Sequence, residues 1–215
     1  ELKIIADETH RLDRICSTHA RSRQSALDAA RAGFDNVFHA SYIDERGIEA
    51  CLKSGSVITP TLTLLNNLLE AKSSHAGASS AAAFARELEA ASVNLRRAYD
   101  AGVPLLAGSE SGWSPVPYGQ WHARELELFV TLLGLTPLQA IHTITGAATR
   151  LMSPHYRHKV GLIQEGRYAD LLVVPGNPLE DITILQRPSM FKDIIKSGIS
   201  INRVPPPRRE RMWYE

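Results

Sequence analysis

The amino-acid sequence predicts an α/β fold in which strand–helix units build a parallel sheet. Between residues 14 and 134, four short apolar runs alternate with helical patterns, and several of these patterns end at a glycine. Alternation at this spacing is typical of βα units and a parallel sheet. After about residue 157 the pattern changes to short apolar runs with glycine turns, which predicts a small second β module.

The first part of the chain supplies three of the predicted strands. A helix is expected over residues 1–13, because Leu2, Ile5, Thr9 and Leu12 fall on one face. The next expected elements, in order, are a strand over 14–19, a helix over 22–33, a strand over 34–39, a helix over 44–55 and a strand over 56–62.

The second part supplies the fourth strand and longer helices. A Ser- and Ala-rich mobile loop is predicted over 72–83, before a strongly periodic helix over 81–102. Thr136, Pro137 and Gln139 form a capping-box pattern at the start of the last long helix. The remaining expected elements are a strand over 103–110, helices over 120–134 and 136–152, and β-hairpins over 159–177 and 191–204.

Composition narrows the function classes. The 215 residues carry a net charge of +1, so no nucleic-acid partner is expected. Cys16 and Cys51 lie in apolar segments, which favours reduced thiols and a cytoplasmic location. No apolar run approaches the roughly 20 residues that a membrane helix needs. The chain begins at Glu1 inside a helical pattern, so its true N-terminus and any signal peptide are expected to lie outside it.

Three polar residues stand where predicted strands end. His19 and His39 are 20 residues apart, one βα unit, and Glu110 closes the fourth strand. Catalytic groups of α/β folds lie beyond these strand ends, and two imidazoles suit zinc. A nearby carboxylate could bind the metal or accept a proton from water. The spacing alone leaves open the alternative that both histidines are hydrogen-bonded structural residues.

Five segments, in order, give the sequence a family resemblance. They are "STHARSRQSALDAARAGFDNVFHA", "ITPTL", "AGVPLLAGSESG", "ELELFVTLLGLTPLQAIHTIT" and "VGLIQEGRYADLLVVPGNPLEDI". With them the chain resembles the C-terminal half of the amidohydrolase superfamily, in its imidazolonepropionase-like and Xaa-Pro dipeptidase-like branch. The resemblance implies strands five to eight of a (β/α)8 TIM-type barrel over residues 1–156. Residues 157–215 would then hold part of a flanking β-sandwich and a C-terminal tail.

The resemblance also implies the roles of the strand-end residues. His19 and His39 match metal ligands that close strands five and six. Glu110 matches the strand-eight acid, usually aspartate, which touches the metal and acts as general base. The implied cofactor is Zn²⁺, as one or two divalent ions. Because glutamate is one methylene longer than aspartate, Glu110 is either a working variant or a sign of lost activity.

Half of the family's metal ligands have no counterpart in this sequence. The His-x-His pair of strand one and the lysine of strand four are missing, and four strands cannot close the barrel. The chain is therefore expected to be active only with the remaining N-terminal half of the barrel as a partner. A homo-oligomer is a further possible assembly.

Four residues are candidates for substrate binding. Arg21, two residues after His19, could hold a substrate carboxylate through two hydrogen bonds or form a salt bridge instead. Tyr42 and His122 follow strand ends and could line the pocket or have structural roles. Tyr118 belongs to an aromatic loop, 112–121, that could supply an apolar wall.

The predicted function is hydrolysis of a carbon–nitrogen bond by metal-activated water. The substrate is expected to be a small molecule or dipeptide with an amide, urea or carbamate bond. One alternative is a catalytically decayed relative with a ligand-binding or scaffold role. A doubly wound binding domain is a second alternative, which lacks a Gly-x-Gly-x-x-Gly phosphate loop after any strand.

Overall fold

A three-stranded parallel sheet forms the centre of the molecule. The computed structural model describes residues 1–70, 78–112, 116–119 and 121–201. The sheet order is β1 (Ser17–Ala20), β2 (Asn36–His39) and β3 (Val57–Thr59), with Ser17 in register with Asn36 and Asn36 with Val57. Three predicted strands are thereby confirmed, although each is shorter than the predicted segment.

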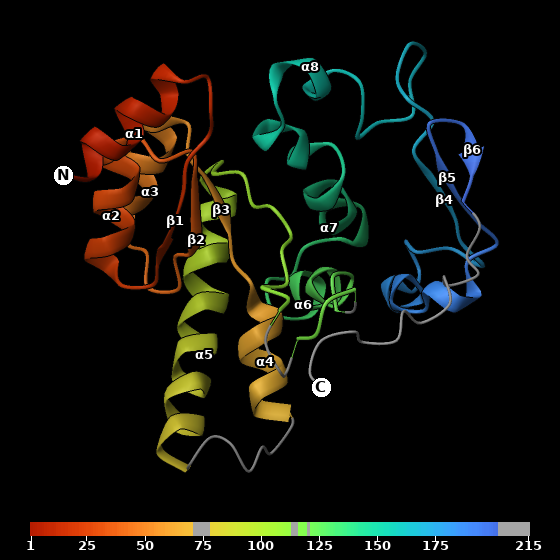
Figure 1. Cartoon of the computed structure of the whole chain (residues 1–215). Helices are drawn as coiled ribbons and strands as arrows, with labels where there is room; N and C mark the ends of the chain where they lie inside the picture. Colours follow the sequence, from red (N-terminus) through yellow and green to blue (C-terminus); the bar gives the residue numbers. More distant parts are fainter. Residues whose placement is uncertain (71–77, 113–115, 120, 202–215) are drawn as a thin grey trace, which may run out of the picture.

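Helices precede and follow each strand, and those around β1 and β2 are the ones that the sequence predicts. Ser22 and Asp44 accept hydrogen bonds from the first turns of α2 and α3, and Gly33 and Gly55 end these helices in the left-handed conformation. Figure 1 shows α1, α2 and α3 grouped on one side of the sheet. Their bounds are Leu2–Arg11 for α1, Arg23–Ala32 for α2 and Glu45–Ser54 for α3.

The fourth predicted strand, over 103–110, is reduced to one β-bridge. Ile58 donates to the carbonyl of Pro104 at 3.0 Å and accepts from the amide of Leu106 at 2.8 Å, so this segment does extend the parallel sheet. Beyond Leu106 the chain leaves β3, because the amide of Ala107 donates to the carbonyl of Thr143.

Two further expectations about helices were wrong. The segment after β3 forms a helix that the sequence analysis missed, α4 (Leu62–Glu70), and residues 78–83 of the predicted loop belong to α5 (Ala78–Asp100); residues 71–77 lie outside the described residues. The predicted helix over 136–152 is divided into α7 (Pro137–Ile144) and a 3₁₀ turn, η1 (Ala147–Leu151), because Thr145 leaves the helical conformation.

The hydrophobic core is formed by the parallel sheet and the helices that pack against it. The described buried cluster joins strand residues Val37 and Ile58 to Leu95 of α5 and Phe129 of α6 (Arg124–Thr131). Helix α1 contributes little to it: Leu2, Ile5 and Leu12 are exposed, and only Ala6 of this helix is buried. Among the described helices, none is long and apolar enough to cross a membrane.

A second, antiparallel sheet lies at the other end of the molecule (Figure 1). Strands β4 (Leu171–Val173), β5 (Asp193–Lys196) and β6 (Ile199–Ser200) pair in sequence order. The hairpin predicted over 191–204 is observed as β5 and β6, as far as the described residues extend. The hairpin predicted over 159–177 is wrong, because β4, the strand described in that range, pairs with β5 instead. The short helix α8 (Pro154–Arg157) precedes β4, and the 3₁₀ turns η2 (Ile182–Gln186) and η3 (Pro188–Met190) lie between β4 and β5.

Candidate metal centre and active site

His19 and His39 meet at the ends of neighbouring strands. His39 is the last residue of β2, and His19 is next to last in β1, whose final residue is in register with His39. Nε2 of His39 lies 2.9 Å from Nδ1 of His19. Two nitrogen ligands of one tetrahedral zinc ion are about 3.3 Å apart, so this pair fits a shared metal with a small adjustment.

The ring of His39 is held in one orientation by Thr61. Thr61 Oγ1 donates to Glu110 Oε2 at 3.3 Å and lies 2.6 Å from His39 Nδ1. Because the hydroxyl proton points to Glu110, we infer that His39 Nδ1 carries a proton and donates it to Thr61. The lone pair then lies on Nε2, the atom that faces His19, as in metal sites where an outer hydrogen bond selects the ligating nitrogen.

The environment keeps His39 neutral. Its side chain is 2% exposed, and burial, reinforced by the charges of Arg21 and His19, lowers the pKa of His39 to about 3. A neutral imidazole is the form that binds a metal ion. No protonation competes with metal binding at His39 near neutral pH.

Glu110 is the third potential metal ligand beside His19 and His39. Its carboxylate lies 3.8 Å from His39 Nδ1, and one ligand atom from each of His19, His39 and Glu110 lies within 4.8 Å of the others. The side chain is 38% exposed, so solvent and substrate can reach it. The structure therefore brings together the three residues that the sequence analysis selected as a metal and proton-transfer site.

The backbone of this site is strained. His39, Ala40, Thr61 and Glu110 all have positive φ angles, of 72°, 50°, 57° and 53°. Non-glycine residues rarely adopt this conformation, which costs of order 1–3 kcal/mol each. Such strain concentrates at functional sites. Here the strained residues lie where the chain turns after β2, after β3 and after the Leu105 segment.

Arg21 is placed beside Glu110 but is not free. Its guanidinium lies 3.7 Å from Glu110 Oε2 and 2.5 Å from Glu87 Oε1 on α5. Glu87 also accepts a hydrogen bond from Ser41 at 2.7 Å. Arg21 is partly buried in this network, so the surface salt bridge considered from the sequence is instead an inward-facing charge cluster.

The other predicted substrate residues border the same sheet ends. The amide of Tyr42 donates to the carbonyl of Arg21, and Tyr42 is exposed. Nδ1 of His122 lies 2.8 Å from Oγ of Ser109, the neighbour of Glu110. Tyr118 is 80% exposed, with its ring beside Gly112. Parts of the predicted aromatic loop, residues 113–115 and 120, lie outside the described residues.

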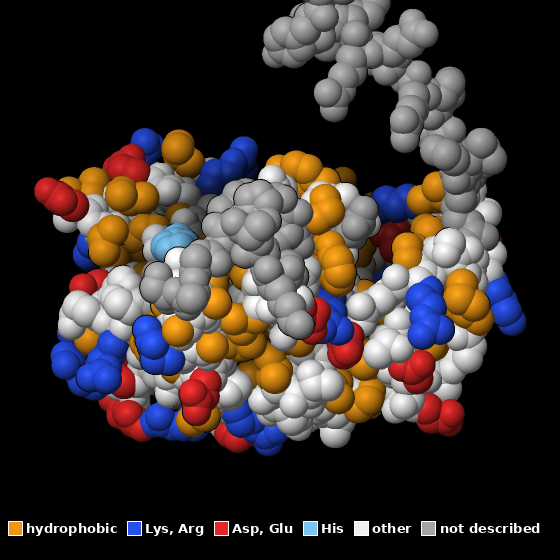
Figure 2. Space-filling view, turned by 90° about the horizontal axis from the view of Figure 1, so that it is seen from below, with side chains coloured by type: hydrophobic (Ala, Val, Ile, Leu, Met, Phe, Trp, Pro, Cys, Tyr) orange, Lys and Arg blue, Asp and Glu red, His pale blue; other side chains and the backbone are white. Residues whose placement is uncertain are grey.

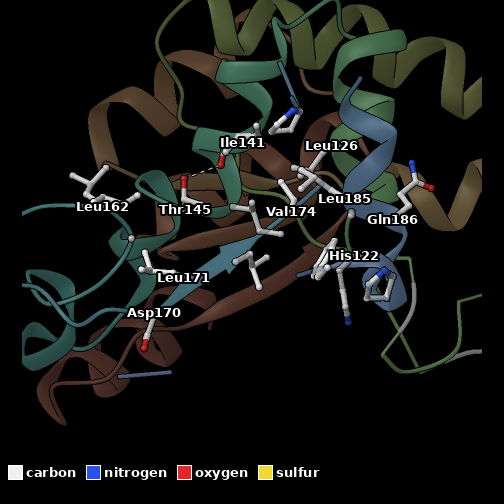
Figure 3. Close-up of a pocket in the computed structure, with 18 of the residues that line it drawn as sticks. His122, Leu126, Ile141, Thr145, Leu162, Asp170, Leu171, Val174, Leu185 and Gln186 are labelled. Atoms are coloured by element: carbon white, nitrogen blue, oxygen red, sulfur yellow. Dashed lines mark hydrogen bonds between the residues drawn. The ribbon is translucent and has the colours of Figure 1, made fainter. Parts of the chain in front are cut away.

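His122 also reaches a large apolar cavity (Figure 3). The cavity has a volume of about 970 Å³ and lies between α6, α7 and the segments around β4. Figure 3 shows Leu126 and Ile141 of the helices on one side and Leu171 and Val174 on the other.

Glu125 is a buried carboxylate that the sequence analysis did not select. It accepts hydrogen bonds from the amides of Leu62 and Thr63, both at 2.8 Å, and from the Thr63 hydroxyl at 2.6 Å. It therefore caps the first turn of α4 from α6. Complete burial raises the pKa of Glu125 to about 7, although these hydrogen bonds oppose the shift.

Sequence reasoning also missed Thr61, Glu87 and Ser109. The Thr59–Leu62 turn marked a strand end, but nothing in the sequence distinguished Thr61 from Thr59. Glu87 is one of several polar residues on a long helix, and its role depends on Arg21, 66 residues earlier. Only the spatial arrangement identifies these residues.

Residues 1–200 match the family model described as "Amidohydrolase family". The chain belongs to the amidohydrolase family. Ochratoxinase from Aspergillus niger is 31% identical over 202 residues, which are 92% of this chain and 40% of that protein. Imidazolonepropionase from Shewanella amazonensis is 27% identical over 177 residues, or 81% of this chain and 37% of the relative.

Two solved structures resemble this chain over most of its length. The crystal structure of the A. niger ochratoxinase matches with a TM-score of 0.82 and 29% identity, over 93% of this chain and 45% of that one. A prolidase complexed with N-methylphosphonate-L-proline matches with a TM-score of 0.78 and 25% identity, over 94% of this chain and 48% of that one. The amidohydrolase chain thus spans less than half the length of these relatives.

Proposed function

We propose that this chain supplies half of the active site of a metal-dependent hydrolase that cleaves an amide or related carbon–nitrogen bond. The observation that carries the proposal is the meeting of His19 and His39 at 2.9 Å, with the Glu110 carboxylate in the same cluster. Membership of the amidohydrolase family supports the general hydrolase assignment.

The residues present fit a divalent ion, and zinc best. His19 and His39 would hold it through imidazole nitrogens, with Glu110 close enough to add a carboxylate oxygen. When bound, such an ion lowers the pKa of water to about 7 and polarises a carbonyl group. Further ligands would come from the N-terminal half of the barrel, so we propose that activity needs that half.

Glu110 is the proposed proton carrier. Its carboxylate would accept a proton from the attacking water and return it to the leaving nitrogen. Thr61 and Arg21 hold the Glu110 carboxylate in place, the first by a hydrogen bond and the second by charge. These contacts restrict a side chain that is longer than the family's usual aspartate.

The substrate we propose is a small molecule or dipeptide that carries a carboxylate. Nη1 of Arg21 is engaged by Glu87, whereas Nη2 lies 3.7 Å from Glu110 Oε2 and would be the atom that binds a substrate carboxylate. The prolidase that resembles this chain was solved with a phosphonate analogue that contains proline, which supports an amino-acid-derived substrate. Tyr42, Tyr118 and His122 would line the site around the substrate.

The test is Glu110→Gln in a protein in which this chain forms part of a whole barrel. The variant is expected to retain its metal but lose at least 100-fold in kcat on a dipeptide panel, because glutamine cannot accept the proton. Metal analysis and kinetics are measured on the same sample. Glu89→Gln, on the exposed side of α5, is the matched control. Unchanged turnover in Glu110→Gln would refute the role of Glu110. If the wild-type protein itself held no metal and showed no activity, the alternative of a catalytically decayed relative would be supported.

A further inference from the structure

A second group of potential metal ligands lies at the opposite ends of the same strands. His10, Cys16 and Asp35 each offer one ligand atom, and these atoms lie within 4.8 Å of one another. Cys16 directly precedes β1 and Asp35 directly precedes β2, whereas His19 and His39 lie at the far ends of these strands. The two groups are therefore separated by the length of the strands.

Backbone hydrogen bonds hold two of the three residues in place. The amide of Cys16 donates to Asp35 Oδ2 at 2.8 Å, and the amide of Asp35 donates to the carbonyl of Cys16 at 3.0 Å. His10 reaches the pair from the last turn of α1, with Nε2 at 2.9 Å from Asp35 Oδ2. The positions of Cys16 and Asp35 are thus fixed before an ion binds.

We propose that His10, Cys16 and Asp35 form a structural site for a divalent ion of zinc-like preference. Imidazole nitrogen, thiolate sulfur and carboxylate oxygen are the three ligand types that zinc accepts. His10 is 43% exposed and Asp35 is 30% exposed, so water can occupy a fourth position. Cys16 is buried and gives the site its sulfur ligand.

Binding changes the protonation of the site in a defined way. The Cys16 thiol loses its proton, because the thiolate is the metal ligand. His10 binds the ion through the lone pair of Nε2, so its ring proton lies on Nδ1 in the bound state. The proton of the Cys16 thiol is released to solvent.

The position of the site indicates a structural role, the attachment of α1 to the parallel sheet. Among the residues of α1, only Ala6 is buried, and it packs in a small cluster with Cys16 and Phe34 that is separate from the main core. An ion bound by His10 from α1 and by the two residues that precede β1 and β2 would join the helix to the sheet. Metal binding would then add directly to the stability of this end of the molecule.

The test is titration of the purified chain with Co²⁺, which reports sulfur ligation by a thiolate charge-transfer absorption in the near ultraviolet. The wild-type chain is expected to show this band, saturating at one ion, and Cys16→Ser is expected to lose it. Cys51→Ser, which removes the other buried thiol, and His19→Ala/His39→Ala, which removes the proposed catalytic ligands, should both keep the band. Absence of the band in the wild type, or its loss in Cys51→Ser alone, would overturn the proposal.

His10→Gln tests the same site without disturbing a buried residue. Glutamine keeps the helix propensity and can still donate to Asp35, but it is a poor zinc ligand. Its Co²⁺ affinity is expected to fall at least tenfold, and Zn²⁺ should raise the Tm of the wild type more than that of the variant. Equal affinity and equal Tm shifts in the two proteins would show that His10 is no ligand and overturn the proposal.

Discussion

The parallel β1–β3 sheet and the antiparallel β4–β6 sheet differ in how they are buried. Val37 and Ile58, in β2 and β3, are 0% exposed, whereas Leu172 in β4 and Ile199 in β6 are 56% and 73% exposed. Parallel sheets are covered on both faces by their crossover helices, and antiparallel sheets can leave one face open. The first sheet therefore carries the core and can hold a strained polar site at its edge.

Exposed apolar side chains also occur in the segment that holds the antiparallel sheet. Figure 2 shows apolar side chains spread over one face of the molecule, among scattered acidic and basic side chains. The exposed apolar residues of the described chain include Ile163 and Ile199, which both follow residue 157. The stability of the segment after residue 157 therefore depends less on the burial of apolar side chains.

The largest expected effect comes from a cavity in the parallel sheet. Ile58→Ala should lower the free energy of unfolding by about 2–5 kcal/mol, because a fully buried side chain is lost between β2 and the Leu105 segment. Leu172→Ala, its match in the exposed sheet, should cost less than about 1 kcal/mol. Urea unfolding of both variants measures the difference, and equal losses would remove the contrast between the sheets.

The second-largest effect is the pH dependence of stability that the buried carboxylate of Glu125 produces. Its pKa is about 7 in the folded chain and 4.5 without burial, so the folded state binds the proton more tightly. Its stabilising contribution is complete below pH 4.5 and is lost as pH rises through about 7, by an amount on the order of a few kcal/mol.

Glu125→Gln should remove this part of the pH dependence. The variant should also be less stable at pH 5 by about 1 kcal/mol, because the amide nitrogen of glutamine cannot accept the hydrogen bond from Leu62 or Thr63. Unfolding is measured from pH 4 to pH 8, with Glu89→Gln as the exposed control. A wild-type profile that stays flat through pH 7 would contradict the assignment.

A smaller effect is expected at the metal ligands of the parallel sheet. Thr61→Val keeps the shape of the side chain but removes the hydroxyl that orients His39. Loss of such an outer hydrogen bond typically weakens metal binding by about 10–100-fold. Zn²⁺ titration of this variant, beside Thr131→Val on the exposed face of α6, measures the loss. Equal affinities would show that Thr61 does not position the ligand.

The smallest effect is expected in the antiparallel sheet. Asp170 accepts from Lys196 Nζ and from the amide of Ser197, and these contacts lower the pKa of Asp170. A lowered pKa stabilises the fold above the usual carboxyl pKa and loses that effect as pH falls. Asp170→Asn should lower Tm less than the other variants do, and only above that pH. A larger loss of Tm than in Ile58→Ala would reverse the ranking of the two sheets.

The strand–helix order and the residues at the strand ends follow from local sequence signals. Helix caps such as Ser22 and Gly33, and the apolar runs that became β1, β2 and β3, are local signals that the final fold keeps. Because the ends of parallel strands meet at one edge of a sheet, the positions of His19, His39 and Glu110 along the chain are enough to group them. The family resemblance rests on the same segments.

Other features of the fold and the site depend on contacts between segments that are far apart in the sequence. Helix α4 is capped by Glu125, which is 63 residues from Leu62, whereas the sequence analysis ended a strand at Leu62 and assigned no helix to the residues after it. The fourth strand shrank to a bridge because its later residues pair elsewhere, and Arg21 became part of an inward network through Glu87 on α5. A propensity or a period acts over a few residues, whereas burial, strain and hydrogen bonding of these groups arise only when distant segments pack together.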